Sequence, residues 1–329
     1  MKRLLALATL AGAAAVARRY LAVRDALAQV PAELRSPLLP LLTGSTTTRS
    51  LPRSRLINRI KTPSGPGVMV TSRKIPGWPP VTVFVTAPTE PRPLRPGLLY
   101  IHGGGMIMGS PQMEALGSGT MARELEAVTV SPEYRLAPEH PFPAALDDCM
   151  ATLTWMRENA AELGIDPDRI AVIGSSAGGG LAAAVAQRAH DEGIRLRAQV
   201  LVYPMIDDRT ALRDDHGGRG AFLWTPQSNL FGWTAYLGRA PRLSDAPPYA
   251  APARRTDLSG LAPAWIGVGS LDLFHDESVA YAKALQDCGV ACELVTVPGM
   301  YHGADGLARN APAMKEFRRR TLDYLRSYL

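Results

Sequence analysis

The sequence predicts an α/β domain with a doubly wound, mostly parallel sheet. Short apolar segments rich in β-branched residues alternate with longer helix-like segments, and several apolar segments are continuous rather than alternating in polarity. Continuous apolar runs are typical of strands buried on both faces of a sheet that helices cover. A chain of 329 residues is long enough to bury such a sheet in one large domain.

The predicted elements follow one another in a regular order after a Pro- and Thr-rich stretch, residues 37–53. The predicted strands are Val81–Thr86, Gly97–Ile101, Ala127–Val130, Ile170–Ile173, Ala198–Tyr203, Ala264–Val268 and Cys292–Val297. The predicted helices are Met113–Leu125, Ala144–Leu163, Ala177–Asp191, Ser278–Cys288 and Ala311–Leu329. Their alternation places the helices on the faces of the sheet.

One segment departs from this alternation. Residues 207–253 are rich in Gly, Pro, Asp, Arg and aromatic residues but have no strand pattern. We interpret the segment as an insertion that, together with about the first 50 residues, forms a cap over the ends of the strands. A helical satellite that packs only for stability is the alternative.

The positive charge of the chain is concentrated at its N-terminus. The net formal charge is +6, but residues 1–60 carry ten Lys or Arg and two Asp or Glu, so the remaining 269 residues sum to −2. The body of the chain has no basic patch with interleaved aromatic residues. We therefore predict no nucleic-acid partner.

The N-terminal residues leave several targeting alternatives open. The apolar run Leu4–Val16 is too short to span a bilayer, and Ala15–Ala17 fits a small-x-small cleavage pattern. Arg18 and Arg19 follow at once, which is unfavourable after a cleavage site. We expect a cytoplasmic protein whose extension contains an amphipathic helix over Arg18–Val30. The alternatives are export and an uncleaved anchor that contacts a membrane surface.

The cysteines indicate neither disulfides nor a metal site. Cys149, Cys288 and Cys292 form no even set, and no His or Cys cluster near the last two could complete a zinc site. We predict no metal and no cofactor.

The most informative motif is Gly174-Ser175-Ser176-Ala177-Gly178, which lies between an apolar strand and a helix. Gly-x-Ser-x-Gly at such a turn is typical of a nucleophile elbow, where a strained turn holds the serine hydroxyl clear of the sheet. Small residues two positions before and after the serine avoid a clash. Ser176 is therefore the candidate nucleophile.

A serine nucleophile needs a base, and on this type of sheet the base follows the serine in the chain. His302 lies directly after the last predicted strand, where a loop at the carboxyl end of that strand would deliver it. The other histidines considered are His140, His190, His216 and His275. Position favours His302 over all of them.

The acid that orients the base should follow the preceding strand. Asp272 stands first after the turn that ends Ala264–Val268, and it is the candidate acid. Asp276 and Glu277 are expected instead to charge the first turn of the next helix, where acidic residues suit the helix dipole.

Donors for the oxyanion are predicted in a glycine-rich loop. Gly97–Ile101 runs into His102-Gly103-Gly104-Gly105, and consecutive glycines expose backbone N–H groups. We predict an oxyanion hole made by Gly103, Gly104 and the amide of Ala177. A phosphate-binding loop is disfavoured because no Walker lysine follows and the spacing is not G-x-G-x-x-G.

These motifs together resemble the hormone-sensitive lipase-like family of α/β-hydrolase esterases. The likeness rests on His102–Gly105, Tyr134–Ala144, Gly174–Gly179, Asp272 with Asp276-Glu277, and Tyr301–Gly303. It covers about residues 65–329 in consistent order. The resemblance implies an α/β-hydrolase fold, a mostly parallel central sheet flanked by helices with a helical cap from the N-terminus and an insertion. It also implies a catalytic triad of Ser176, Asp272 and His302.

We predict an N-terminal extension and cap segment, residues 1–55, and an α/β-hydrolase catalytic domain, residues 56–329, with a cap insertion at about 207–253. Two departures from the family pattern stand out. Ser175 occupies a position that is usually Asp or Thr, and Leu273-Phe274-His275 follows Asp272 where Pro-Leu-Arg is frequent. Plant hormone receptors on the same scaffold lack the catalytic histidine, so His302 disfavours a receptor role.

We predict a serine carboxylesterase that hydrolyses short- to medium-chain acyl esters of small molecules, with Met106, Met108, Phe222 and Trp224 as the apolar wall of the pocket. A deacetylase or amidase of a small acylated metabolite would use the same triad. A binding protein that keeps the fold without turnover is the alternative outside the enzymes. A homodimer is compatible with the sequence, which does not decide the oligomeric state.

Overall fold

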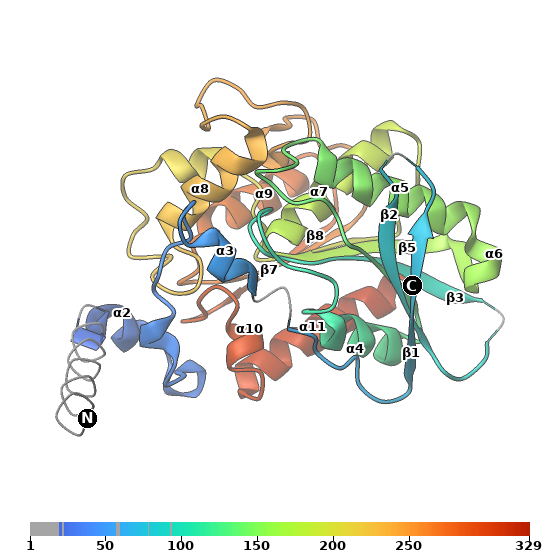
Figure 1. Cartoon of the computed structure of the whole chain (residues 1–329), viewed down its shortest axis with the longest axis horizontal. Helices are drawn as coiled ribbons and strands as arrows, with labels where there is room; N and C mark the ends of the chain where they lie inside the picture. Colours follow the sequence, from blue (N-terminus) through green and yellow to red (C-terminus); the bar gives the residue numbers. More distant parts are fainter. Residues whose placement is uncertain (1–19, 22, 57–59, 78, 93) are drawn as a thin grey trace, which may run out of the picture.

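A single mixed sheet organises the chain (Figure 1). The computed structural model describes residues 20, 21, 23–56, 60–77, 79–92 and 94–329. Eight strands lie in the order β1-β2-β4-β3-β5-β6-β7-β8. Strand β2 pairs antiparallel with β1 and β4, and all other neighbours are parallel. The strands are β1 Val68–Ile75, β2 Val81–Pro88, β3 Arg95–Ile101, β4 Val128–Pro132, β5 Ile165–Ser175, β6 Gln199–Val202, β7 Ala264–Gly269 and β8 Cys292–Val297.

Burial explains why the central strands were predictable and β1 was not. Every residue of β4, β6 and β7 is buried, as expected for strands covered by helices on both faces. In β1 only Ile75 is buried, because this strand lies at the edge of the sheet and exposes both apolar side chains, such as Met69, and charged ones, such as Arg73. Its three apolar residues Val68–Val70 are followed by four polar ones, so its sequence lacks the longer apolar run of the central strands.

Helices cover both faces of the sheet and divide the core into two clusters. On one face lie α5 Ala144–Glu158, α7 Ala177–Asp191 and α9 His275–Asp287; on the other lie α4 Ala115–Leu125 and α11 Pro312–Tyr328 (Figure 1). The short helix α6, Ala160–Leu163, follows α5, and α10, Ala304–Leu307, precedes α11.

Several predicted helix boundaries need correction. The helix predicted over Ala144–Leu163 is two helices, because the chain leaves helical geometry at Asn159, whose side chain donates to the Trp155 carbonyl at 2.9 Å. Helix α9 begins at His275 rather than Ser278, so Asp276 and Glu277 do occupy its first turn. Helix α4 begins at Ala115, two residues later than predicted.

The N-terminal segment and the 207–253 segment meet above the carboxyl ends of the parallel strands. Within the second segment lie a 3₁₀ helix, Asp208–Leu212, and α8, Pro226–Leu237. The amide of Leu223 donates to the Leu42 carbonyl at 2.7 Å. The Thr46 amide donates to Ser228 Oγ at 2.8 Å.

The N-terminal segment begins, in its described part, with α2, Arg24–Gln29, followed by the 3₁₀ helices Ala32–Leu34 and Leu39–Leu41 and by α3, Leu51–Ser54. Just after α3, the guanidinium of Arg55 binds both carboxylate oxygens of Glu139 at 2.7 Å and lowers the pKa of Glu139 to about 2. This ion pair ties the segment to the loop before α5. The apolar run Leu4–Val16 and the pattern at Ala15–Ala17 lie outside the described residues.

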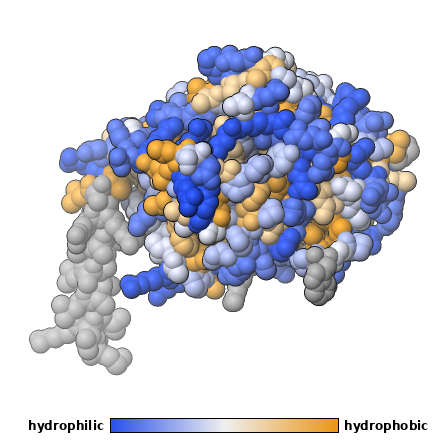
Figure 2. Space-filling model, turned by 90° about the horizontal axis from the view of Figure 1, so that it is seen from above, coloured by the Kyte–Doolittle hydropathy of each residue, from blue (hydrophilic) through white to orange (hydrophobic). Residues whose placement is uncertain are grey.

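Exposed apolar side chains occur on the same segment, among them Leu21, Leu38, Leu41 and Leu56. Seen from above, the surface is mainly hydrophilic with hydrophobic residues in separate groups (Figure 2). Among the described residues, no helix combines the length and apolar character needed to cross a membrane.

Candidate active site

The turn between β5 and α7 holds Ser176 in a strained conformation. Its φ is 56° and its ψ is −120°, a region that non-glycine residues rarely adopt. A Cβ at Gly174 would lie 2.1 Å from the Gly178 carbonyl oxygen, and one at Gly178 would lie 2.1 Å from the Ile101 carbonyl oxygen. The turn therefore requires glycine at both positions, as the motif indicated.

Ser176, His302 and Asp272 form one hydrogen-bonded chain. His302 Nε2 lies 2.9 Å from Ser176 Oγ, and His302 Nδ1 lies 2.9 Å from Asp272 Oδ2. These residues follow β5, β8 and β7, whose carboxyl ends meet at one edge of the sheet. With its Nδ1–H held by the carboxylate, the imidazole presents Nε2 as an acceptor for the serine proton.

Packing and a second hydrogen bond fix the acid and the base. Asp272 is fully buried, and its Oδ1 accepts the amide of Phe274 at 2.9 Å. The ring of Phe274 contacts the His302 imidazole edge-on at 5.3 Å between centroids, and the ring of Tyr203 does so at 4.7 Å. Tyr203 was not among the predicted site residues; it lies just after β6, without a motif to mark it.

The alternative acid lies elsewhere. Asp276 is half-exposed and pairs with His275 at 3.0 Å and with Arg213 and Arg219 at 3.4 and 3.3 Å. Hydrogen bonding from His275, together with these arginines, lowers the pKa of Asp276. His275 is thus engaged by Asp276 and not by the serine.

The predicted role of Gly103 needs correction. Its amide donates to Glu114 Oε1 at 2.8 Å, so it has an acceptor within the protein and is not a free oxyanion donor. Within the described part of the chain, the amides of Gly104, Gly105 and Ala177 donate to no protein acceptor. These amides are the donors that the geometry offers to an oxyanion beside Ser176. Glu114 itself carried no sequence signal, because no motif includes it.

The glycine loop is held in place from behind. The His102 imidazole stacks on the Tyr134 ring at 4.1 Å, and the Tyr134 hydroxyl donates to the His102 carbonyl at 2.9 Å. His102 Nδ1 lies 2.8 Å from the Gly103 carbonyl oxygen. Burial lowers the pKa of His102 to about 4, so the ring is neutral at pH 7. The Tyr134–Ala144 stretch thus supports the loop from a buried position.

A pocket of about 530 Å³ opens beside Ser176. Its apolar lining comes from the N-terminal segment, the loop after β3 and the 207–253 segment. These residues are Leu41, Leu42, Met108, Met113, Leu223 and Trp224. Of the predicted pocket residues, Met108 and Trp224 line it.

The predictions for Met106 and Phe222 are wrong. Met106 has a φ of 65°, and its side chain is buried in the core. The ring of Phe222 packs edge-on against Tyr301 at 5.8 Å and belongs to the core on the other face of the sheet. Neither side chain lines the pocket beside Ser176.

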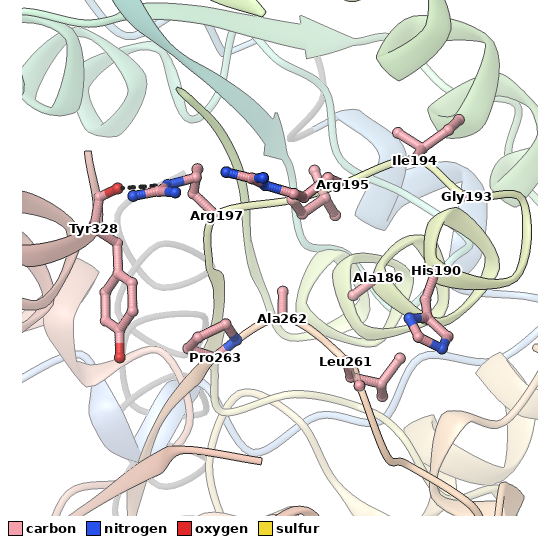
Figure 3. Close-up of a pocket in the computed structure, with 12 residues that line it drawn as sticks. Ala186, His190, Gly193, Ile194, Arg195, Arg197, Leu261, Ala262, Pro263 and Tyr328 are labelled. Carbon is pink, nitrogen blue, oxygen red and sulfur yellow. Dashed lines mark hydrogen bonds between the residues drawn. The ribbon is translucent and has the colours of Figure 1, made fainter. Parts of the chain in front are cut away.

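A second hollow lies at the amino ends of β6 and β7, opposite the edge of the sheet that carries Ser176. Figure 3 shows the residues that line it. His190, Arg195, Leu261 and Tyr328 are among the residues around it. Arg197 donates from Nε to the Tyr328 carbonyl at 3.2 Å at one end. Ser176 and His302 are absent from its lining, so it is separate from the triad.

Comparison with known proteins places this geometry in a family. Residues 98–305 match a family model described as the alpha/beta hydrolase fold. The chain belongs to this family, in its hormone-sensitive lipase-like branch.

Named relatives narrow the activity. Carboxylesterase NlhH of Mycobacterium tuberculosis is 38% identical over 256 residues, which are 77% of this chain and 77% of the relative. Esterase LipI of the same organism is 34% identical over 290 residues, covering 84% of this chain and 88% of the relative. The solved structure of a bacterial heroin esterase has a TM-score of 0.84 at 34% identity and covers 92% of this chain and 98% of that one. The chain is accordingly a carboxylic ester hydrolase.

Proposed function

We propose that this enzyme hydrolyses short- to medium-chain acyl esters through an acyl-enzyme intermediate on Ser176. The observation that carries the proposal is the hydrogen-bonded chain from Ser176 through His302 to the buried Asp272. Ser176 lines a pocket that has apolar side chains and, in Gly104 and Gly105, backbone amides without an acceptor among the residues that the structure describes.

In the first half of the reaction, His302 Nε2 accepts the Ser176 proton as Oγ forms a bond to the ester carbonyl carbon. The negative charge moves to the carbonyl oxygen, where the amides of Gly104, Gly105 and Ala177 stabilise it. The tetrahedral intermediate then breaks its bond to the alcohol oxygen, and the proton held by His302 passes to the departing alcohol.

In the second half, His302 accepts a proton from water, and the hydroxyl oxygen attacks the acyl carbon. Collapse of the second tetrahedral intermediate breaks the bond to Ser176 Oγ, which regains its proton from His302. Asp272 stays ionised throughout and stabilises the imidazolium form of His302. The products are a carboxylic acid and an alcohol.

The pocket supports the proposed chain length. Its volume of about 530 Å³ is in the ordinary range for small-molecule sites, and Leu42, Met108 and Trp224 offer apolar contact to an acyl chain. Trp224 is 5% exposed, with its indole NH 3.3 Å from Asn229 Oδ1, so it forms a fixed wall.

The test is a series of p-nitrophenyl esters from acetate to palmitate, with butyryl p-nitroanilide as the amide. We expect kcat/KM to peak at butyrate to octanoate, to be low for palmitate and the anilide, and to vanish in Ser176→Ala. The exposed Ser327→Ala is the matched control and should match the wild type. Ester turnover that persists in Ser176→Ala would overturn the mechanism, and a preference for the anilide or palmitate would overturn the substrate class.

A further inference from the structure

Glu114 lies beneath the nucleophile elbow and contacts both the elbow and the glycine loop. It immediately precedes α4, and its Oε1 accepts the Gly103 amide at 2.8 Å. The same oxygen accepts the Ser175 hydroxyl at 3.2 Å, and Oε2 lies 3.4 Å from that hydroxyl. One carboxylate therefore joins the loop that precedes the free amides to the turn that carries the nucleophile.

The three groups converge closely. A Cβ built on Gly103 would lie 3.0 Å from the Ser175 carbonyl oxygen, 3.3 Å from Ser175 Oγ and 3.4 Å from Glu114 Oε1. The side chain of residue 175 therefore reaches the same space beside Gly103 that the Glu114 carboxylate occupies. Because serine is short and has a hydroxyl to donate, it leaves room for a carboxylate from another element and binds to it.

We propose that Glu114 is a positioning residue for ester hydrolysis, holding the start of the glycine loop in register with Ser176 so that the amides of Gly104 and Gly105 face the oxyanion. This inference rests on the proposed function. Loss of the anchor leaves nucleophile, base and acid in place but lets the donors move. A misplacement of about 1 Å can cost roughly 100-fold in rate. The loss falls on kcat, because the donors bind the charge only as it develops.

The surroundings of Glu114 already resist a negative charge. Burial raises its pKa to about 7, opposed by the hydrogen bonds from Gly103 and Ser175 and assisted by the charge of Asp305. Glu114 also lines a second cavity, which Ser176 does not line. The other titratable or charged groups around that cavity are Tyr100 on β3, Tyr203 after β6, Asp305 on α10, Arg309, and Arg318 on α11. A second carboxylate at residue 175 is therefore expected to disrupt the anchor.

The test compares Glu114→Ala, which removes the acceptor, with Glu114→Gln, which keeps a carbonyl oxygen that can accept the Gly103 amide. We expect kcat to fall roughly 10- to 100-fold in Glu114→Ala with KM within about twofold of wild type, and to fall less in Glu114→Gln. Glu124→Gln, an exposed glutamate at the other end of α4, is the matched control and should leave both constants unchanged.

Moving the carboxylate from residue 114 to residue 175 distinguishes a positioning role of Glu114 from a role in stability alone. Ser175→Asp alone should lose activity, and the double variant Glu114→Gln with Ser175→Asp should regain kcat to within about threefold of Glu114→Gln, because the single carboxylate then comes from residue 175. Thermal unfolding of each variant gives the folded fraction in the assay. If Glu114→Ala does not fold, recovery in the double variant decides.

Two results would overturn the inference: kcat per folded molecule that is unchanged in Glu114→Ala, or a double variant that does not recover. Failure of the proposed function looks different, since wild-type ester turnover would then persist in Ser176→Ala.

Discussion

Replacing Asp272 by Asn removes the carboxylate that orients His302 without changing the size of the side chain. Asp272 is fully buried, and its two oxygens accept His302 Nδ1–H and the Phe274 amide, each at 2.9 Å. An asparagine that keeps its oxygen on the Phe274 amide turns its NH₂ group toward Nδ1. The imidazole then accepts at Nδ1 and carries its proton on Nε2, where it can no longer take the Ser176 proton.

The expected loss is large because His302 in the wrong tautomer carries its proton on Nε2 and cannot accept the Ser176 proton there. We predict a fall in kcat of about 10⁴-fold for Asp272→Asn, which corresponds to about 5 kcal/mol of transition-state stabilisation. KM should change little, because the carboxylate lies beneath the imidazole and is not part of the pocket lining.

The assay is steady-state hydrolysis of p-nitrophenyl butyrate, with thermal unfolding to show that the variant is folded. Asp276→Asn is the matched control, since Asp276 is a nearby carboxylate on this segment that pairs with His275 and arginines instead. Its kcat should stay within about twofold of wild type. A loss below tenfold in Asp272→Asn, or equal losses in both variants, would refute the assignment of Asp272.

Other substitutions test the loop and the pocket. Gly104→Ala should lower kcat by at least 100-fold, because its φ is +123° and the added Cβ would lie 2.0 Å from the Met108 carbonyl oxygen; a kinetic comparison that finds wild-type kcat would contradict this. Burial lowers the pKa of His102 from 6.5 to about 4, so between these pH values the unfolded chain binds a proton that the folded chain does not. The contribution of His102 to the free energy of unfolding is therefore fully present above pH 6.5, and about 3 kcal/mol of it is lost as the pH drops to 4. Between pH 7 and pH 4 the melting temperature should therefore decrease less in a folded His102→Asn variant than in the wild type. Equal decreases in the two proteins would contradict this prediction. Trp224→Ala should raise the ratio of kcat/KM for octanoate to that for acetate roughly tenfold, since it removes a fixed wall; an unchanged ratio would place the acyl chain elsewhere.

The central strands were predictable because burial on both faces of the sheet leaves a direct trace in the sequence, whereas the order of the strands in the sheet was not predicted. Strands such as β6 and β7 are continuous apolar runs, and the structure buries all of their residues. Strand β1 left no such trace, because its side chains are mostly exposed at the edge of the sheet. The break at Asn159 escaped prediction because the residue leaves helical geometry, with a φ of −106° and a ψ of 20°, although no Gly or Pro marks the position in the sequence.

The triad was predictable from the elbow motif, which marks Ser176, together with chain order, since parallel strands bring their carboxyl ends to one edge. The details that depend on side-chain direction were not. Met106 stands beside the glycine loop in sequence, but its positive φ turns it into the core. The Gly103 amide is satisfied by Glu114, which is 11 residues away and belongs to no motif. Such contacts arise from packing between elements, which a single sequence does not encode as a local pattern.

The most direct test of the central claim is to identify the residue that carries the covalent intermediate. The protein is treated with a fluorophosphonate, digested, and mapped by tandem mass spectrometry, in parallel with Ser176→Ala. We predict a single phosphonyl group on Ser176, complete loss of esterase activity at full labelling, and no adduct in the variant. An adduct on Ser175 or on any other residue, or full labelling with esterase activity retained, would contradict Ser176 as the nucleophile.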